Sequence, residues 1–138
     1  MMRYGESSIV QVVQSWQDSW TANTVATPSY GEVEVTWDRH PNPDVDVYEV
    51  LIGEGNIRDA ILPAPNLPFL NVLPAHQRLI GAEIELVNVM ARETRLKRAL
   101  QEIRNEYHYI FIDCPPSLGL LTVNTLTAAD SVIVPIQC

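Results

Sequence analysis

Apolar side chains recur with a helical period in three segments of the middle of the chain. Residues 47–62 predict two short helices that are separated by the glycines of Gly53-Glu54-Gly55. Residues 78–91 predict an amphipathic helix, because apolar residues recur at i, i+4, i+7 and i+11. Residues 93–107 predict a further amphipathic helix. The apolar faces comprise Ile80, Ile84, Val87 and Ala91 in the former, and Leu96, Leu100, Ile103 and Tyr107 in the latter.

Three short apolar segments predict strands. Residues 66–75 hold an apolar run between prolines that suits a strand of about five residues. Residues 109–113 (YIFID) and 131–136 (SVIVPI) are nearly continuous apolar runs, as in strands covered on both faces in a parallel sheet. Residues 120–129 are long enough for a crossover helix between them, which makes a right-handed βαβ unit. The pattern predicts the α/β class, with a doubly wound and mainly parallel sheet.

The first 37 residues differ in character from the rest of the chain, since they hold all three tryptophans and few charges. A helical spacing of four apolar residues there suits a short amphipathic helix, and residues 32–37 (EVEVTW) alternate like an exposed strand. Two prolines make residues 38–46 a turn-rich connection. We therefore expect an unrecognised segment over 1–37 and a domain over 38–138. The helical spacing concerns Val10, Val13, Trp16 and Trp20.

Composition narrows the class of protein. A chain of 138 residues with 46% hydrophobic and 19% charged residues suits one globular domain. The net charge of −8 argues against a wholly basic surface for nucleic acid. Cys114 and Cys138 have no zinc-site spacing and are expected to be reduced thiols. With no apolar run of about 20 residues and no signal-peptide pattern, we predict a cytoplasmic protein with no membrane contact.

Asp113 ends the apolar run of residues 109–113 and is the first candidate for chemistry. Ligands of open parallel sheets gather at the carboxyl ends of the strands, so Asp113 is expected to point into that crevice. A carboxylate there suits Mg²⁺, which prefers oxygen ligands and keeps much of its water. Pro115 and Pro116 stiffen the following loop, and Gly119 lets it turn. The alternative is that Asp113 caps the next helix or turn.

Three segments of the chain resemble one protein family. They are residues 109–138 (YIFIDCPPSLGLLTVNTLTAADSVIVPIQC), residues 81–100 (GAEIELVNVMARETRLKRAL) and, more loosely, residues 47–62. They resemble the ParA/Soj chromosome- and plasmid-partitioning ATPases, relatives of MinD with a deviant Walker P-loop. The resemblance covers roughly residues 38–138. The run from Asp113 to Gly119 is its most specific part.

The resemblance implies roles for the residues around Asp113. Asp113 matches the Walker B acid that supports Mg²⁺ beside the phosphates of ATP. The loop that follows matches switch II, which senses the γ-phosphate. Implied partners are a ParB-type protein, non-specific DNA and a second copy in an ATP-dependent dimer, with association with the nucleoid. The switch II-like loop comprises Cys114, Pro115, Pro116, Ser117, Leu118 and Gly119.

Two motifs of that family do not occur in this sequence. The phosphate-binding loop KGGVGKTT is absent, no lysine precedes Arg39, and Gly5 and Gly31 stand alone. The motif Asp-x-Asp-Pro-Gln-Gly is absent too. The segment that begins at Asp38 does not replace it, because it lies too close to residues 47–62. We therefore expect a partial fold that lacks the P-loop strand–helix unit and the C-terminal part. The electrostatic positioning of a triphosphate would then be lost.

Three interpretations follow from the sequence. The first is a truncated ParA-type partitioning ATPase that does not hydrolyse ATP on its own. The second is a non-enzymatic module that pairs with a full-length relative, with the arginines and lysine of residues 92–106 as the place for a partner or DNA. The third is a gene fragment with an empty place at the centre of its sheet, beside residues 109–113, unless residues 32–37 or another element fills it.

The remaining candidates are weaker. His40, His76 and His108 have no metal-site spacing and suit surface or packing roles. Ser117 lacks the Gly-x-Ser-x-Gly frame of a hydrolase. Asn124 lies in the crossover helix, where it either reaches the site or packs inward or on the helix surface. The charges of residues 93–102 suit a solvated helix face with i,i+4 pairs, Glu93–Lys97 and Arg98–Glu102.

Overall fold

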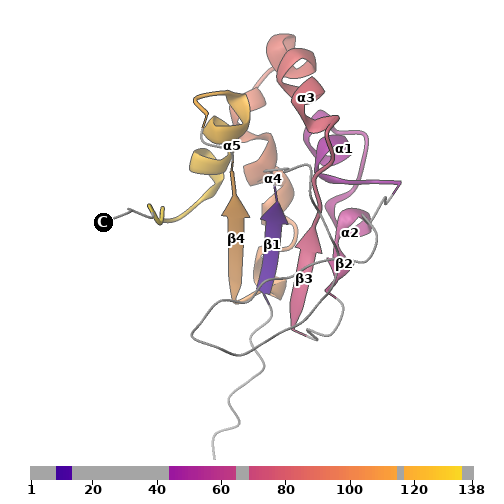
Figure 1. Cartoon of the computed structure of the whole chain (residues 1–138), viewed down its shortest axis with the longest axis vertical. Helices are drawn as coiled ribbons and strands as arrows, with labels where there is room; N and C mark the ends of the chain where they lie inside the picture. The colour runs from indigo at the N-terminus through magenta and orange to yellow at the C-terminus, as the bar shows by residue number, and fades with distance from the viewer. Residues whose placement is uncertain (1–8, 14–43, 65–68, 115–116, 135–138) are drawn as a thin grey trace, which may run out of the picture.

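A four-stranded sheet lies at the centre of the fold (Figure 1). The computed structural model describes residues 9–13, 44–64, 69–114 and 117–134, and for 9–13 the backbone alone. The sheet order is β2-β3-β1-β4, with β1 parallel to both of its neighbours and β2 antiparallel to β3. The α/β class and the mainly parallel sheet predicted from the sequence are confirmed. The strands are β1 (Ile9–Val13), β2 (Leu62–Pro63), β3 (Leu70–Leu73) and β4 (Tyr109–Asp113).

The central place between β3 and β4 is occupied by β1, so another element fills the sheet centre, which is the exception that the sequence left open. Ile9 pairs with Leu70 on one side and with Tyr109 on the other. The helix expected from Val10 onward is wrong for residues 10–13, which belong to β1. β-branched residues favour a pleated strand, and two partner strands take up the backbone hydrogen bonds that a helix would make internally. The rest of that predicted helix, and residues 32–37, lie outside the described residues.

The two short helices predicted for residues 47–62 are confirmed as α1 (Val47–Ile52) and α2 (Ile57–Ala60). Asp46 caps α1 in a capping box, in which its carboxylate accepts a hydrogen bond from the backbone of Tyr48 at 2.6 Å. Gly53 ends α1 with φ of 87°, a left-handed conformation that glycine adopts without steric cost. The break between the two helices therefore has a local cause, the glycine at the end of α1, as the sequence predicts.

The helix predicted for residues 78–91 is present but shorter, and it buries another face. α3 (Leu79–Glu85) passes into η1 (Leu86–Asn88), and Ala91 interrupts the helix with a left-handed φ of 56°. The predicted stripe of Ile80, Ile84 and Val87 is exposed. Leu79, Ala82 and Leu86 are buried instead, because they also recur at helical spacing and lie on the side toward the core.

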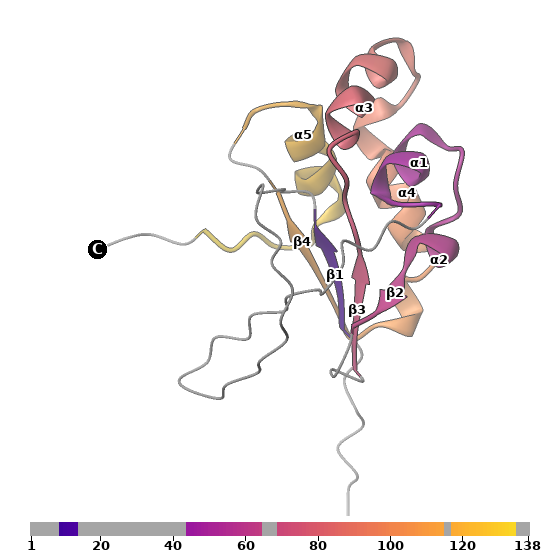
Figure 2. The ribbon, with the colours of Figure 1, turned by 45° about the vertical axis from the view of Figure 1, so that its right-hand side comes forward.

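The next helical segment agrees better with its prediction. It consists of η2 (Arg92–Thr94), α4 (Arg95–Gln101) and η3 (Arg104–Glu106). Leu96, Leu100 and Ile103 are buried in the core, and Tyr107 packs against it, so the predicted apolar face is confirmed. The helix predicted for residues 120–129 is present as α5 (Leu120–Ala128). α1, α2 and α4 share one side of the sheet (Figure 2).

The other side of β4 differs from its prediction. Ile110 and Ile112 pack toward the helices, but Tyr109 and Phe111 are 59% and 48% exposed, so coverage on both faces is wrong for β4. Residues 131–134 are exposed and form no strand, which contradicts that part of the predicted strand 131–136. An apolar run becomes a strand only where a partner takes up its backbone groups. We call Tyr109, Phe111 and residues 131–134 the exposed side.

Candidate functional site

Asp113 lies at the carboxyl end of the parallel strands, as the sequence predicts. It is the last residue of β4, it is exposed, and it pairs in register with Val13, the last residue of β1. α3 and α5 lie at this same end of the sheet (Figure 1). The N-cap of α5 is Gly119, so Asp113 does not cap that helix. Asp113 is thus positioned by two adjacent strands at the edge where parallel sheets bind ligands.

The switch II-like loop joins β4 to α5. Cys114 is a half-buried free thiol, and Pro115 and Pro116 lie outside the described residues. Ser117 is exposed, and its hydroxyl lies 3.4 Å from that of Thr122 in the first turn of α5. Leu118 next to it is 99% exposed. The described part of this loop presents a hydroxyl and an apolar side chain to solvent.

Glu83 of α3 contacts the end of this loop and was not singled out by the sequence. Its Oε1 accepts a hydrogen bond from the backbone N–H of Leu121 at 3.4 Å. The same carboxylate lies against Gly119, where an added Cβ would overlap Oε1 and stand 3.0 Å from Cδ. Glu85 has the same chemistry two residues later, so only the orientation of α3 distinguishes the two acids.

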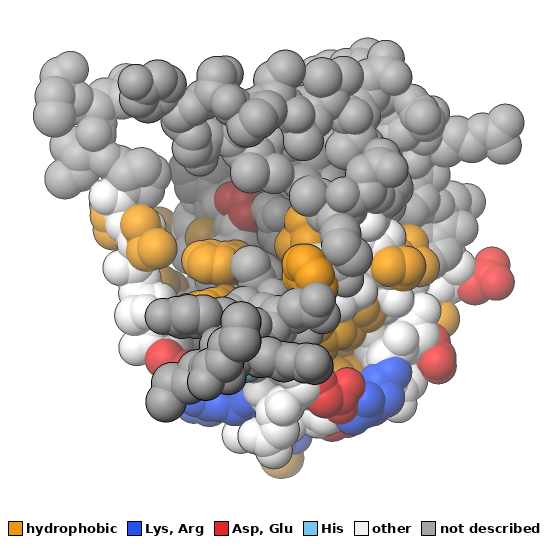
Figure 3. Space-filling view, turned by 90° about the horizontal axis from the view of Figure 1, so that it is seen from below, with side chains coloured by type: hydrophobic (Ala, Val, Ile, Leu, Met, Phe, Trp, Pro, Cys, Tyr) orange, Lys and Arg blue, Asp and Glu red, His pale blue; other side chains and the backbone are white. Residues whose placement is uncertain are grey.

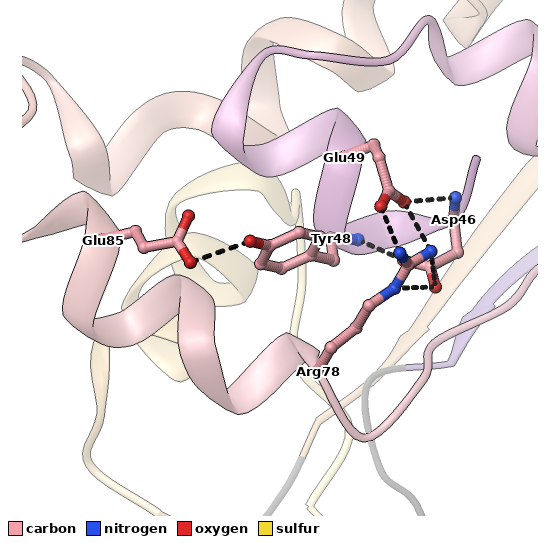
Figure 4. A network of polar contacts seen from close by, with 5 residues as sticks. All are labelled: Asp46, Tyr48, Glu49, Arg78 and Glu85. Carbon is pink, nitrogen blue, oxygen red and sulfur yellow. Dashed lines mark hydrogen bonds and ion pairs between the residues drawn. The ribbon is translucent and has the colours of Figure 1, made fainter. Parts of the chain in front are cut away.

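A polar network joins α3 to α1 (Figure 4). The guanidinium of Arg78 donates to Asp46 at 3.1 Å and pairs with Glu49 at 2.7 Å. The hydroxyl of Tyr48 donates to Glu85 at 2.8 Å, and this hydrogen bond to a carboxylate raises the pKa of Tyr48. Asp46 is buried, so its charge is compensated by Arg78 and by the backbone of α1. The network holds both ends of α3 against α1.

Asn124 packs inward, which settles the alternatives that the sequence leaves open for it. Its side chain is fully buried, and its Oδ1 accepts from the backbone N–H of Leu96 at 3.1 Å. Its Nδ2 donates to the carbonyls of Arg92 and Leu120 at 2.9 and 3.1 Å. Asn124 therefore fixes α5 to the start of α4.

The carboxylate of Asp113 suits Mg²⁺ only together with further oxygen ligands such as phosphates. Among the described residues no group of three or more His, Cys, Asp or Glu side chains could hold a metal ion. Asp113 contributes one carboxylate, and Mg²⁺ is usually bound by one or two carboxylates plus substrate phosphates. His76 and His108 are half-buried and exposed, and His40 lies outside the described residues. A single carboxylate would need further oxygen ligands, such as phosphates, to hold the ion.

The charged residues of the helical segment 92–106 are arranged differently from the prediction. Glu93 pairs with Arg92 at 3.0 Å, and neither expected i,i+4 pair is among the ion pairs of the described residues. Glu93 precedes α4 and Glu102 follows it, so neither pair shares a regular helix. Arg104 pairs with Asp130 at 3.0 Å. In Figure 3, basic side chains likewise lie beside acidic ones.

A groove of about 680 Å³ runs along the outer edge of β4. Its walls include Phe111 of β4, Thr125 of α5 and Ile133 of the following segment, and it reaches Asp113 and Cys114 at one end. Residues 131–133, from the segment that the sequence predicts as the second strand of a βαβ unit, line this groove without forming a strand. None of the helices in the described ranges is long and apolar enough to cross a membrane.

Comparison with known proteins places these observations in a family. A family model described as AAA domain (AAA_31) matches residues 22–138. The sporulation initiation inhibitor protein Soj of Bacillus subtilis is 54% identical over 92 residues, which are 67% of this chain and 36% of Soj. The chromosome partitioning protein ParA of Myxococcus xanthus is 53% identical, and the match covers 67% of this chain and 32% of the length of that ParA. This chain spans about a third of the length of these relatives.

Solved structures agree on the fold. Cobyrinic acid a,c-diamide synthase of Mycobacterium smegmatis, solved with an ATP analogue and magnesium, has a TM-score of 0.71 and 36% identity over 96% of this chain and 48% of its own. A plasmid partition protein of Borrelia burgdorferi bound to AMPPNP has a TM-score of 0.65 over 90% of this chain and 47% of its own, and at 19% identity it shows the fold alone. The chain belongs to the AAA domain family AAA_31, and it is similar in sequence to the ParA and Soj partitioning proteins.

Proposed function

We propose that this chain supplies the Walker B carboxylate and the switch II-like loop of a ParA-type protein that segregates chromosomes or plasmids. The observation that carries the proposal is the position of Asp113, at the end of β4 and in register with the end of β1. The loop after it leads directly into α5, whose first residue is Leu120. The family and the partitioning relatives support this assignment.

In this proposal Asp113 holds Mg²⁺ through water, and residues 114–119 respond to the γ-phosphate. The magnesium would neutralise charge on the phosphates of ATP. The exposed carboxylate of Asp113 is a hard oxygen ligand at the ligand-binding edge of the sheet. A ParB-type protein, non-specific DNA and a second copy of the chain are the proposed partners, as in the family.

The activity of this chain by itself is proposed to be very low. Backbone amides and a lysine of the glycine-rich loop normally bind the phosphates, and this sequence contains no such loop. Asp113 alone offers no positive charge to a triphosphate. Because positioning and electrostatics supply nearly all of the catalysis in phosphoryl transfer, we expect weak binding of Mg·ATP and no measurable hydrolysis.

Calorimetric titration with Mg·ATP tests this proposal, with an intact ParA-type protein as the positive control. The chain is expected to bind with a Kd above about 100 µM. Asp113→Ala is expected to abolish the remaining binding, whereas Asp130→Ala, which removes an exposed acid paired with Arg104, leaves it unchanged. A Kd below about 10 µM would contradict the expected weakness. Binding that survives Asp113→Ala would contradict the role of Asp113.

A second candidate function is a non-enzymatic module that pairs with a full-length ParA-type protein. Exposed apolar side chains around the carboxyl end of the sheet favour it, since Ile84 and Met90 are 77% and 89% exposed. Affinity capture with an intact ParA-type protein, with and without ATP, tests this function. Ile84→Ser should weaken the complex, and Asp59→Ser, which changes an exposed acid of α2, should not. The idea fails if no complex forms under either condition.

A further inference from the structure

The contact between Glu83 and the end of the switch II-like loop links α3 to that loop. Glu83 is half-buried, its Oε1 accepts from the N–H of Leu121, and its carboxylate occupies the space beside Gly119. Gly119 has φ of −76°, which any residue can adopt. An added Cβ at position 119 would therefore displace the Glu83 carboxylate without straining the backbone.

α3 is a fixed support for this contact. Arg78, just before the helix, is held by Asp46 and Glu49, and Glu85 near its end is held by Tyr48. Glu83 lies between these two attachments and reaches the other way, to the loop and α5. A carboxylate on a braced helix holds its partner in place more firmly than one on a mobile segment.

The two ends of the switch II-like loop are also held. Asp113 belongs to the ladder between β4 and β1, and Asn124 ties α5 to α4. The start of α5 lies one turn before Asn124, and there the side chain of Glu83 accepts from the first turn of the helix. A negative charge at a helix N-terminus is also favourable.

We propose that Glu83 is a positioning residue that sets where the switch II-like loop ends, by holding Gly119 and the first turn of α5 against α3. Its connection to nucleotide rests on the proposed function, but the contact itself exists without nucleotide. Loss of Glu83 frees the loop and the first turn of α5 while the core and the network of α1 and α3 stay intact.

Hydrogen exchange of the Leu121 amide tests the proposal in the full chain without nucleotide. Glu83→Ala should speed this exchange by about tenfold at unchanged thermal melting, because the amide loses its acceptor. Glu83→Gln keeps an acceptor and should restore most of the protection. Ile84→Ala, on the same helix but with its side chain 77% exposed, is the matched control and should leave exchange at Leu121 unchanged.

A double-mutant cycle tests the contact with Gly119. Gly119→Ala displaces the Glu83 carboxylate and should speed exchange at Leu121 by about threefold to tenfold, but by less than about twofold when Glu83→Ala is already present. Exchange at wild-type rate in Glu83→Ala, or additive effects of the two changes, overturns the proposal. Because no nucleotide is used, these outcomes are independent of the Mg·ATP titration, whose failure would count against the proposed function alone.

Discussion

The helical layer of α1, α3, α4 and α5 and the exposed side are both rich in Ile, Leu, Val and Tyr, yet they differ in burial. Leu96 of α4 is fully buried, whereas Ile133 on the exposed side is 80% exposed. In the helical layer the buried side chains of Asn124 and Asp46 also have hydrogen-bond partners. Apolar content alone does not bury a segment, because burial also needs a partner surface of matching shape and satisfied backbone groups.

The largest difference in the free energy of unfolding is expected between two variants, each with one apolar side chain truncated in one of the two regions. Leu96→Ala should lower the free energy of unfolding by about 2–5 kcal/mol, because it leaves a cavity in the core. Ile133→Ala should change it by less than about 0.5 kcal/mol, since it is a surface change. Urea denaturation of both variants measures the difference. A similar loss for Ile133→Ala would show that the exposed side is packed in solution.

A smaller effect is expected from two ion pairs, one buried in the helical layer and one next to the exposed side in sequence. The side chain of Asp46 is 3% exposed and that of Asp130 is 77% exposed, and each binds one arginine. Asp46→Ala should cost about 1–3 kcal/mol, because it removes a helix cap and leaves Arg78 without its buried partner. Asp130→Ala should cost less than about 0.5 kcal/mol. Equal costs in denaturant titrations would contradict this contrast.

The smallest effect is a pH dependence within the helical layer. The pKa of Tyr48 is raised above its ordinary value of 10.0, first by its hydrogen bond to Glu85. The folded state therefore holds this proton more tightly than the unfolded state, and the stabilisation is present below pH 10 and lost as the pH rises through the folded pKa. Tyr48→Phe should flatten part of the decline in stability above pH 10.

Denaturation at a series of alkaline pH values checks this expectation. Tyr107→Phe is the matched comparison, because burial raises the pKa of Tyr107 and gives it a decline of the same sign. The stability of the double variant should decline less steeply with rising pH than that of either single variant. An unchanged slope in Tyr48→Phe would mean that the contact between Tyr48 and Glu85 does not form in solution.

Much of the fold was predictable where one local cause dominates. Gly53 ends α1 because only a left-handed residue fits there, and the apolar face of α4 has a single possible orientation toward the core. The place of Asp113 at the end of β4 followed from an apolar run that stops at an acid. The family resemblance rested on the same residues, and the comparisons confirm it.

Other features were not predictable because two patterns compete at the same positions. Residues 9–13 have apolar spacing that suits a helix and β-branched residues that suit a strand, and the neighbouring β3 and β4 favour the strand. α3 has two apolar stripes, and packing against α1 selects the one that contains Leu79. The role of Glu83 depends on this choice, because the orientation of α3 directs its carboxylate to Gly119.

The amino-acid order alone established the class of the fold, the ends of the short helices, the acid at the end of β4 and the family. These depend on neighbours in the chain, through backbone sterics, capping and period. The tertiary structure decided that β1 lies at the sheet centre, that residues 131–134 stay exposed, and that Asn124 and Glu83 hold α5. Those features depend on contacts between residues far apart in the chain, where the energy of packing outweighs local preference.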